Sequence, residues 1–252
     1  MIARQLRALA ATESVVGRAI PRTVGPRRAG DPPVLVARSS RALAARPRKR
    51  ASRRPDGRTI PYLRRHFVPP PERFALRDHL ASKGISIEMM AEAGLLITGE
   101  DVKIPYDRFR DRVMFPIRDP RGRVIALGGR ALKADVPAKY LNSPETPLFH
   151  KGAVLYNQDK ARGPAHETGE IIAVEGYMDV VALAQYGIEY AVAALGTATT
   201  PYHITKLMRQ TDEVVFCFDG DTAGLNAAWR AAMNALPALT DSLRLGFLFL
   251  PS

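Results

Sequence analysis

Three acidic residues, Glu175, Asp219 and Asp221, stand at the ends of two short apolar runs of the sequence. Residues 170–174 lead directly into Glu175-Gly176, and residues 214–218 lead into Asp219-Gly220-Asp221. Carboxylates that crowd together repel one another unless a cation joins them, and hard oxygen ligands of this kind suit Mg²⁺. The pattern therefore predicts a magnesium-dependent phosphoryl-transfer centre, in which a metal ion clamps a triphosphate.

The apolar runs are too short for helices and do not alternate with polar residues, so we interpret them as strands buried on both faces. In open parallel sheets the ligand site lies outside the carboxyl ends of the strands, where these acids stand. We expect strands at 170–174, 190–194, 213–218 and 243–250, and helices at 178–186, 201–209 and from Thr222 to Leu236. Strands that alternate with helices indicate βαβ units and a parallel sheet.

The last of these helices has a continuous apolar stripe, as expected of a helix that packs against a core. Its members are Leu225, Ala228, Trp229, Ala232, Met233 and Leu236. Near the start of the helix at 178–186, Asp179 has two interpretations of equal standing. It is either a further ligand of the metal or a carboxylate that stabilises the helix N-terminus.

The net charge of +12 is concentrated at the N-terminus. Residues 1–65 hold 17 Lys and Arg against 3 acidic residues, which leaves 20 basic and 22 acidic residues for the rest of the chain. We predict a disordered Arg- and Pro-rich tail over residues 1–66, with a nucleic-acid-grasping arm and an organellar targeting segment as lesser alternatives. A small α+β domain over 67–165 and an α/β domain over 166–252 complete the predicted organisation.

The predicted small domain begins with helices at 72–82 and 86–94 and continues with a hairpin over 113–127. The sequence Asp119-Pro120-Arg121-Gly122 has the signature of a type I turn, and Pro116 indicates an edge strand or a bulge. The segments that follow are poor in core residues but carry basic and hydrogen-bonding groups: Arg130, Lys139, Tyr140, Asn142, Ser143 and Lys151. A solvated loop and a phosphate-tracking surface with a stacking ring are equally good interpretations.

Several classes of protein are excluded or unsupported. The single cysteine, Cys217, permits no intrachain disulfide or cysteine-rich zinc site, favours a reducing compartment and is expected in the core. No apolar run reaches 18 residues, so no transmembrane helix is predicted. Neither a P-loop nor a dinucleotide-binding fingerprint follows a strand, no nucleophile elbow is present, and His203 is expected to be structural.

Two groups of motifs resemble those of bacterial replicative DNA primases. Residues 175–179 (Glu-Gly-Tyr-Met-Asp), 194–197 and 218–221 are similar to the toprim domain of this family, and residues 112–117, 128–130, 139–146 and 149–152 to its basic subdomain. The resemblance covers about residues 70–250. It implies a toprim-type parallel sheet flanked by helices, preceded by a smaller α+β subdomain.

The resemblance implies synthesis of short RNA primers from ribonucleoside triphosphates on single-stranded DNA in the cytoplasm, with Mg²⁺ or Mn²⁺. By this resemblance, Glu175, Asp219 and Asp221 are metal ligands, and Asp179 is an additional one. The residues that bind phosphates of the template or nucleotide are then Arg112, Arg130, Lys139, Tyr140 and Lys151. A non-catalytic single-strand-binding remnant and another toprim enzyme, a nuclease or topoisomerase, are the alternatives.

The chain departs from the family pattern at both ends. The zinc ribbon with which the family begins, a further acidic pair after the last strand and the helicase-docking region are all absent from this sequence. We therefore expect this polypeptide alone to be weakly active or inactive.

Overall fold

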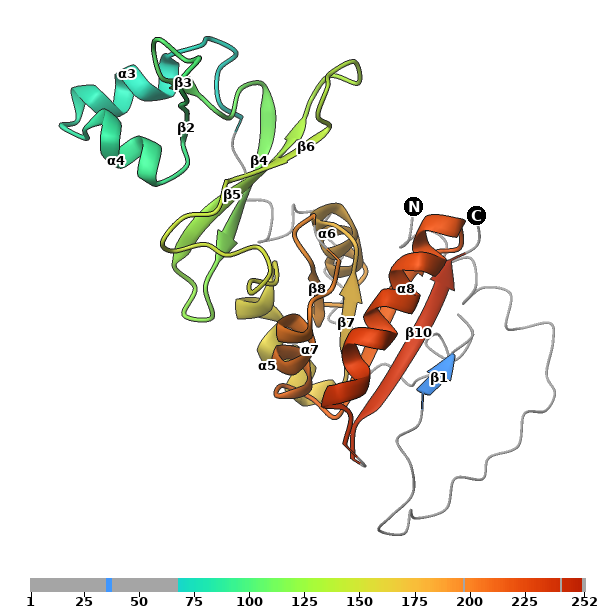
Figure 1. Cartoon of the computed structure of the whole chain (residues 1–252). Helices are drawn as coiled ribbons and strands as arrows, with labels where there is room; N and C mark the ends of the chain where they lie inside the picture. The colour runs from blue at the N-terminus through green and yellow to red at the C-terminus, as the bar shows by residue number, and fades with distance from the viewer. Residues whose placement is uncertain (1–34, 38–67, 197, 241, 251–252) are drawn as a thin grey trace. The chain divides into compact units, whose positions relative to one another are not determined.

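The structure, a computed structural model, describes residues 35–37, 68–196, 198–240 and 242–250. They form two compact units, residues 68–154 and residues 155–250 together with 35–37 (Figure 1). The sequence placed this division after residue 165. It did not predict helix α5 (Gln158–Thr168), which contacts β7 and β8 and so belongs to the second unit. Apart from residues 35–37, the predicted tail lies outside the described residues.

The first unit begins with the two predicted helices, α3 (Ala75–Ser82) and α4 (Ile87–Glu92). The hydroxyl of Ser86 caps α4 by accepting a hydrogen bond from the Met89 amide at 3.3 Å. Gly84 and Gly94 follow the two helices with φ of +81° and +68°, a conformation that glycine adopts without strain. Two short paired strands, β2 (Leu96–Ile97) and β3 (Tyr106–Asp107), come next.

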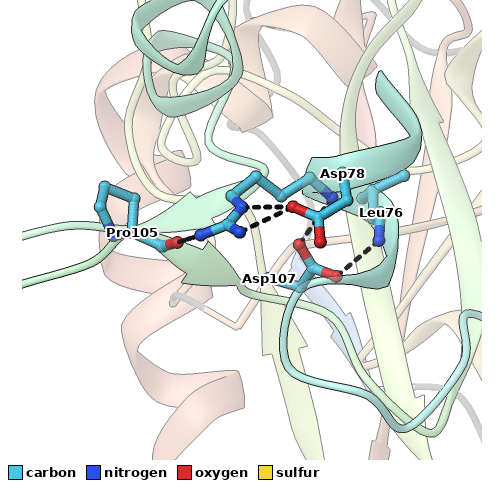
Figure 2. A network of polar contacts seen from close by, with 5 residues as sticks. Leu76, Asp78, Pro105 and Asp107 are labelled. Carbon is cyan, nitrogen blue, oxygen red and sulfur yellow. Dashed lines mark hydrogen bonds and ion pairs between the residues drawn. The ribbon is translucent and has the colours of Figure 1, made fainter. Parts of the chain in front are cut away.

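The buried Asp107 joins β3 to the start of α3 (Figure 2). Its carboxylate accepts hydrogen bonds from the backbone amides of Leu76, at 2.7 Å, and Arg77, at 2.9 Å. The Arg77 guanidinium in turn donates to Asp78 and to the carbonyl of Pro105. A carboxylate from a distant strand therefore satisfies amides of the first turn of α3, which have no partner within a helix.

The predicted hairpin is present as β4 (Arg112–Arg118) and β5 (Val124–Ala131) of a three-stranded antiparallel sheet. Its turn is closed by the Gly122 amide, which donates to the Asp119 carbonyl at 2.9 Å. Pro116 was predicted to mark an edge strand or a bulge. It lies on the edge strand β4, and the strand register shifts next to it, at Ile117/Arg118. The third strand, β6 (Tyr140–Asn142), was not predicted and pairs with β5.

The second unit is a parallel sheet with strand order β1-β10-β9-β7-β8 (Figure 1). The four predicted strands are confirmed as β7 (Ile171–Val174), β8 (Ala191–Ala193), β9 (Glu213–Asp219) and β10 (Arg244–Leu250). The short strand β1 (Leu35–Ala37) pairs with β10 and was not predicted. The predicted helices are α6 (Tyr177–Gln185), α7 (Pro201–Met208) and α8 (Thr222–Ala235), which continues into the 3-10 turn η2 (Leu236–Ala238).

One core joins alternate residues of β7, β9 and β10 to helices α5, α7 and α8. On α8 the contributing residues are all alanines, Ala228, Ala231, Ala232 and Ala235. The predicted apolar stripe of α8 is buried only in part, because its members Ala228 and Ala232 lie in the core. The larger side chains Leu225, Trp229, Met233 and Leu236 stay exposed. Among the described helices, none has both the length and the apolar character needed to cross a membrane.

Candidate metal and nucleic-acid sites

Glu175 and Asp219 meet at the carboxyl edge of the parallel sheet. Strand β7 pairs directly with β9, with Ala173 opposite Phe216, so the residues after Val174 leave the sheet beside the end of β9. The Asp219 amide donates a hydrogen bond to the Glu175 carboxylate, with 3.3 Å between nitrogen and Oε1. The two strands are therefore neighbours, which is the arrangement that a metal site shared by Glu175 and Asp219 requires.

Asp179 and Asp221 each hold the start of a helix. Asp179, in the first turn of α6, accepts a hydrogen bond from the Gly176 amide at 3.0 Å through Oδ2. Asp221 precedes α8 and accepts one from the Gly224 amide at 2.8 Å through Oδ1. Both carboxylates thus have the capping role that the sequence left open for Asp179, and each bond orients the side chain at this edge.

Burial and neighbouring carboxylates raise the pKa values of Glu175 and Asp179. Burial, and then the charges of Asp219, Asp179 and Asp221, raise the pKa of Glu175 above its ordinary range, against a lowering by the Asp219 amide. Burial and then the Asp219 charge likewise raise the pKa of Asp179. The buried Cys217 thiol of β9 has its pKa raised to about 12, by burial and then by the same carboxylates, which keeps it a protonated core residue. A cation bound at this edge would therefore be favourable, because it would offset the mutual repulsion of these carboxylates.

This donor set fits a hard divalent cation. The carboxylate oxygens of Glu175, Asp179, Asp219 and Asp221 are of the kind that Mg²⁺ and Mn²⁺ take, and a bound cation would relieve the repulsion that raises the pKa of Glu175. Within the described ranges, no three His, Cys, Asp or Glu side chains are already arranged around an ion position. Their carboxylates would therefore have to rotate to surround a cation, and the exposed side chains of Glu175, Asp219 and Asp221 are free to do so.

Gly224 is a site residue that the sequence reasoning missed. A Cβ atom added to it would lie 2.0 Å from the carbonyl oxygen of Asp219 and 2.9 Å from its carbonyl carbon. The first turn of α8 therefore rests against the backbone of the residue that ends β9. The only signal in the sequence is a glycine inside a predicted helix, where its presence calls for a packing or functional reason.

The predicted nucleic-acid residues of the first unit lie on two faces of the antiparallel sheet. Arg130 pairs with Tyr140 across β5 and β6, and its guanidinium lies 5.8 Å from the centre of the tyrosine ring. Asn142 is two residues further along β6, so it shares their face. Arg112 pairs with Ala131, the residue after Arg130, and so projects from the opposite face.

The positions of Arg112 and Lys139 are coupled through the backbone. The Arg112 guanidinium donates to the Lys139 carbonyl at 3.3 Å, while the Lys139 side chain is exposed to solvent. Burial, and then the neighbouring Arg110 charge, lower the pKa of Arg112. Arg112 therefore lies where an additional negative group would be favourable.

Ser143 and Lys151 have different surroundings. Ser143 is buried, and its hydroxyl accepts a hydrogen bond from the Leu127 amide at 3.1 Å, so its contact is within the sheet. Lys151 is half-buried after a tight turn, with its backbone amide donating to the Glu145 carboxylate at 3.0 Å. His150 contacts the same carboxylate, and the Lys151 amide followed by His150 holds the pKa of Glu145 below its usual range. The turn thus fixes the backbone from which Lys151 projects.

A cluster of arginines on aromatic rings was missed by the sequence reasoning. The Arg73 guanidinium lies 4.2 Å from the centre of the Tyr106 ring, Arg110 lies 5.1 Å from the same ring, and Arg77 lies 4.1 Å from the Phe74 ring. Cations and ring faces gathered in this way can bind phosphates and stack on bases. The signal available in the sequence was the repeated spacing of four residues, Arg73 to Arg77 and Tyr106 to Arg110.

Two family models match consecutive parts of the chain. The model described as the N-terminal domain of the DNA primase catalytic core matches residues 52–162, and a Toprim domain model matches residues 169–244.

Relatives and solved structures of the same kind match over most of this chain. The DNA primase of Pseudomonas aeruginosa is 57% identical over 182 residues, which are 72% of this chain and 27% of that protein. A crystal structure of a DNA primase domain from Pseudomonas aeruginosa has 55% identity and a TM-score of 0.69, covering 74% of this chain and 58% of the other. A structure of the DnaG primase catalytic domain bound to single-stranded DNA has 52% identity and a TM-score of 0.67, with the same coverage. The chain thus spans about a quarter of the length of the curated relative.

Proposed function

This chain belongs to the bacterial DNA primase family through its catalytic-core N-terminal domain and its Toprim domain, and we propose that it acts in template-directed synthesis of RNA primers. The reaction is nucleotidyl transfer, in which the hydroxyl of one ribonucleotide attacks the α-phosphorus of the next and pyrophosphate leaves. The proposed substrates are ribonucleoside triphosphates, with single-stranded DNA as template.

The acids at the edge of the parallel sheet are the proposed catalytic set. Glu175, Asp219 and Asp221 would hold Mg²⁺ or Mn²⁺, and Asp179 would orient the Gly176 backbone beside them and add a further oxygen. A divalent ion bound there supplies neutralisation of the charge that develops on the transferring phosphoryl group. Hydrogen bonds from the Asp219, Gly176 and Gly224 amides hold the carboxylates of Glu175, Asp179 and Asp221 at this edge, from which side-chain rotation would bring them around a cation.

The basic surface of the first unit is the proposed site for the template and the triphosphate. Arg130 and Tyr140 share one sheet face and offer a charge for phosphate beside a ring for base stacking. Arg112, Lys139 and Lys151 would add phosphate contacts. Support comes from the 52% identical DnaG catalytic domain, whose structure is that of a complex with single-stranded DNA.

The observation that carries the proposal is the hydrogen bond from the Asp219 amide to the Glu175 carboxylate across two neighbouring strands. It brings two acids that are distant in sequence to one point at the carboxyl edge of a parallel sheet, which is where ligand sites of such sheets lie. Capping requirements alone do not account for Glu175, because it follows a strand and precedes α6 without capping it.

Primer synthesis on a single-stranded template with labelled ribonucleotides, in Mg²⁺ and separately in Mn²⁺, tests the proposal. Product should form in the wild-type chain and be lost in Glu175→Gln and Asp219→Asn. Binding of Mn²⁺, followed by electron paramagnetic resonance, should weaken at least tenfold in both variants. The matched control is Asp212→Asn, since Asp212 is exposed just before the other end of β9 and should change neither readout.

The expectation of weak activity for this polypeptide stays a prediction, and product at the rate of a full-length primase would contradict it. Mn²⁺ binding that survives both variants would overturn the assignment of the metal site. Supercoiled plasmid in the same buffers separates the alternatives, because nicking or relaxation would indicate a toprim nuclease or topoisomerase. Salt-dependent binding of single strands with neither metal binding nor product would indicate a binding protein without catalysis.

A further inference from the structure

Residues 143–150 lead from β6 to a lysine that is proposed to bind phosphate, and packing holds the start of this segment. Ser143 is buried, and its amide donates to the Leu127 carbonyl at 2.8 Å while its hydroxyl accepts from the Leu127 amide at 3.1 Å. Pro144 packs on Gly94, where an added Cβ would lie 2.6 Å from the proline Cδ atom. The chain is therefore anchored on both the sheet and the turn after α4 before it reaches the lysine.

A tight reversal holds the other end of the segment. The Thr146 amide donates to the Phe149 carbonyl at 3.0 Å, and the Phe149 amide donates to the Thr146 carbonyl at 3.1 Å. Phe149 is fully buried, so it fixes the reversal in the core of the first unit. Lys151 comes two residues later, within a turn, and its backbone position is therefore set by this turn and not by a helix or strand.

The Glu145 side chain crosses this turn to Lys151. Its Oε1 atom accepts a hydrogen bond from the Lys151 amide at 3.0 Å, and its Oε2 atom lies 3.1 Å from His150 Nδ1. The side chains of Glu145 and His150 are 58% and 68% exposed, so their ion pair contributes little to stability. The bond from the Lys151 amide is charge-assisted and is the main cause of the lowered pKa of Glu145. This bond is therefore the contact through which Glu145 acts on the backbone.

An acidic side chain beside a lysine that binds phosphate needs a physical reason. A carboxylate and a phosphate repel each other, so the charge of Glu145 by itself weakens phosphate binding at Lys151. Both carboxylate oxygens of Glu145, however, lie against nitrogen atoms of the turn itself. The hydrogen bonds therefore indicate a role in holding the turn.

We propose that Glu145 is a positioning residue, which fixes the backbone of Lys151 so that its ammonium group meets a phosphate of the template strand or of a nucleoside triphosphate. The inference rests on the proposed function of Lys151. A fixed peptide group sets the direction of the Cα–Cβ bond from which the flexible lysine stem extends, and less conformational freedom is then lost on binding. Removal of Glu145 should therefore weaken the phosphate contact, although it removes a negative charge.

Lysine footprinting of the full chain tests the proposal. Trace acetylation, followed by mass spectrometry, is measured with and without saturating oligothymidylate, and separately with and without ATP and Mg²⁺. The ligand that slows acetylation of Lys151 identifies the source of the phosphate. Because the method reports on single lysines, binding of DNA by the basic residues 1–65 does not obscure the result.

The variants separate the hydrogen bond from the charge. In Glu145→Ala the protection of Lys151 should fall at least about threefold, the equivalent of one hydrogen bond, while that of Lys139 is kept. Glu145→Gln retains a carbonyl oxygen that can accept from the Lys151 amide, so it should keep the wild-type protection. Glu100→Ala, which removes another exposed acid of the first unit, is the matched control and should leave both lysines protected.

Several results would overturn the inference. Unchanged protection of Lys151 in Glu145→Ala would mean that the turn holds the lysine without the carboxylate. Equal losses at Lys151 and Lys139, with a lowered melting temperature, would mean that Glu145 stabilises the unit as a whole. A loss in Glu145→Gln as large as that in Glu145→Ala would mean that the charge matters and the amide bond does not. Failure of the proposed function is distinguishable, because neither ligand would then protect Lys151 in the wild type, and the inference would fall with it.

Discussion

Replacing Gly224 by alanine tests whether the acidic edge depends on close packing of α8 against the end of β9. The added Cβ would stand 2.0 Å from the Asp219 carbonyl oxygen, whereas a carbon–oxygen contact needs about 3.3 Å, so the helix must withdraw by roughly 1 Å. Because the opposing atoms are backbone, no side-chain rotation can relieve the overlap. The withdrawal also strains the 2.8 Å bond from the Gly224 amide to Asp221.

The cost of Gly224→Ala is the balance of three effects. Overpacking costs about 1–3 kcal/mol, and weakening of the Asp221 cap costs about 0.5–2 kcal/mol. Alanine in a helix gains about 1 kcal/mol over glycine, which offsets part of this. We expect a net loss of about 2 kcal/mol in the free energy of unfolding, together with weaker Mn²⁺ binding because Asp219 and Asp221 move apart.

Urea unfolding followed by far-ultraviolet circular dichroism measures this loss. Gly176→Ala is the matched control, since Gly176 also lies at the start of a helix at the acidic edge, but its added Cβ would meet only Asp179 Oδ2, at an ordinary 3.5 Å. The free energy of unfolding of this control should fall by less than about 1 kcal/mol. A Gly224→Ala protein that unfolds at the wild-type urea concentration and binds Mn²⁺ normally would refute the close approach of α8 to β9.

Four further variants test the two units separately. Glu175→Gln should raise the free energy of unfolding in metal-free buffer at neutral pH by up to about 1 kcal/mol, because it removes a partly buried carboxylate that its neighbours repel. The folded-state pKa of Glu175 is raised, so this gain should shrink as the pH falls through that pKa and be absent below the ordinary value of 4.5; a gain that grows on acidification would contradict the assignment. Asp107→Ala should cost about 1–2 kcal/mol in the first unit, measured by urea unfolding, because the α3 amides lose their acceptor, and wild-type stability would exclude this capping role. Ser143→Ala should lower the free energy of unfolding by about 1 kcal/mol without changing the affinity for single-stranded DNA. Lys139→Ala should instead weaken this binding and reduce the slope of log affinity against log salt concentration by about 0.7, as measured by fluorescence anisotropy over a range of KCl concentrations. Equal slopes for the two variants would argue against a phosphate contact of Lys139.

Helix α5 shows where local patterns fail as a guide to the fold. It contains Gly163 and Pro164, which oppose helix formation, and it buries only the small residues Ala161 and Ala165. Gly163 removes the Cβ that would clash with the ring of a following proline in a helical backbone. Packing of the two alanines into the core stabilises a helix that its own propensities do not predict.

Strand β6 and helix α8 show that local patterns also fail to predict which strands pair and which face of a helix is buried. Tyr140–Asn142 has little apolar character, and it is a strand because β5 offers it a free edge. The α8 positions were predicted correctly as helical and apolar, but the stripe could not show which flank meets the core. Packing of the helix on the sheet decided that, and the α8 residues in the core are all alanines.

The sequence by itself determined the order of strands and helices in the second unit and the position of the carboxylates at the strand ends. Those features depend on short runs of neighbouring residues, whose length, β-branching and glycine punctuation act locally. Only the tertiary structure decided that β7 lies beside β9, that Glu175 accepts a bond from Asp219, that Arg112 and Arg130 project from opposite faces, and that Gly224 rests on a strand. The reason is physical: strand order, register and the distance between packed elements arise from contacts between residues far apart in the chain, and no local pattern records them.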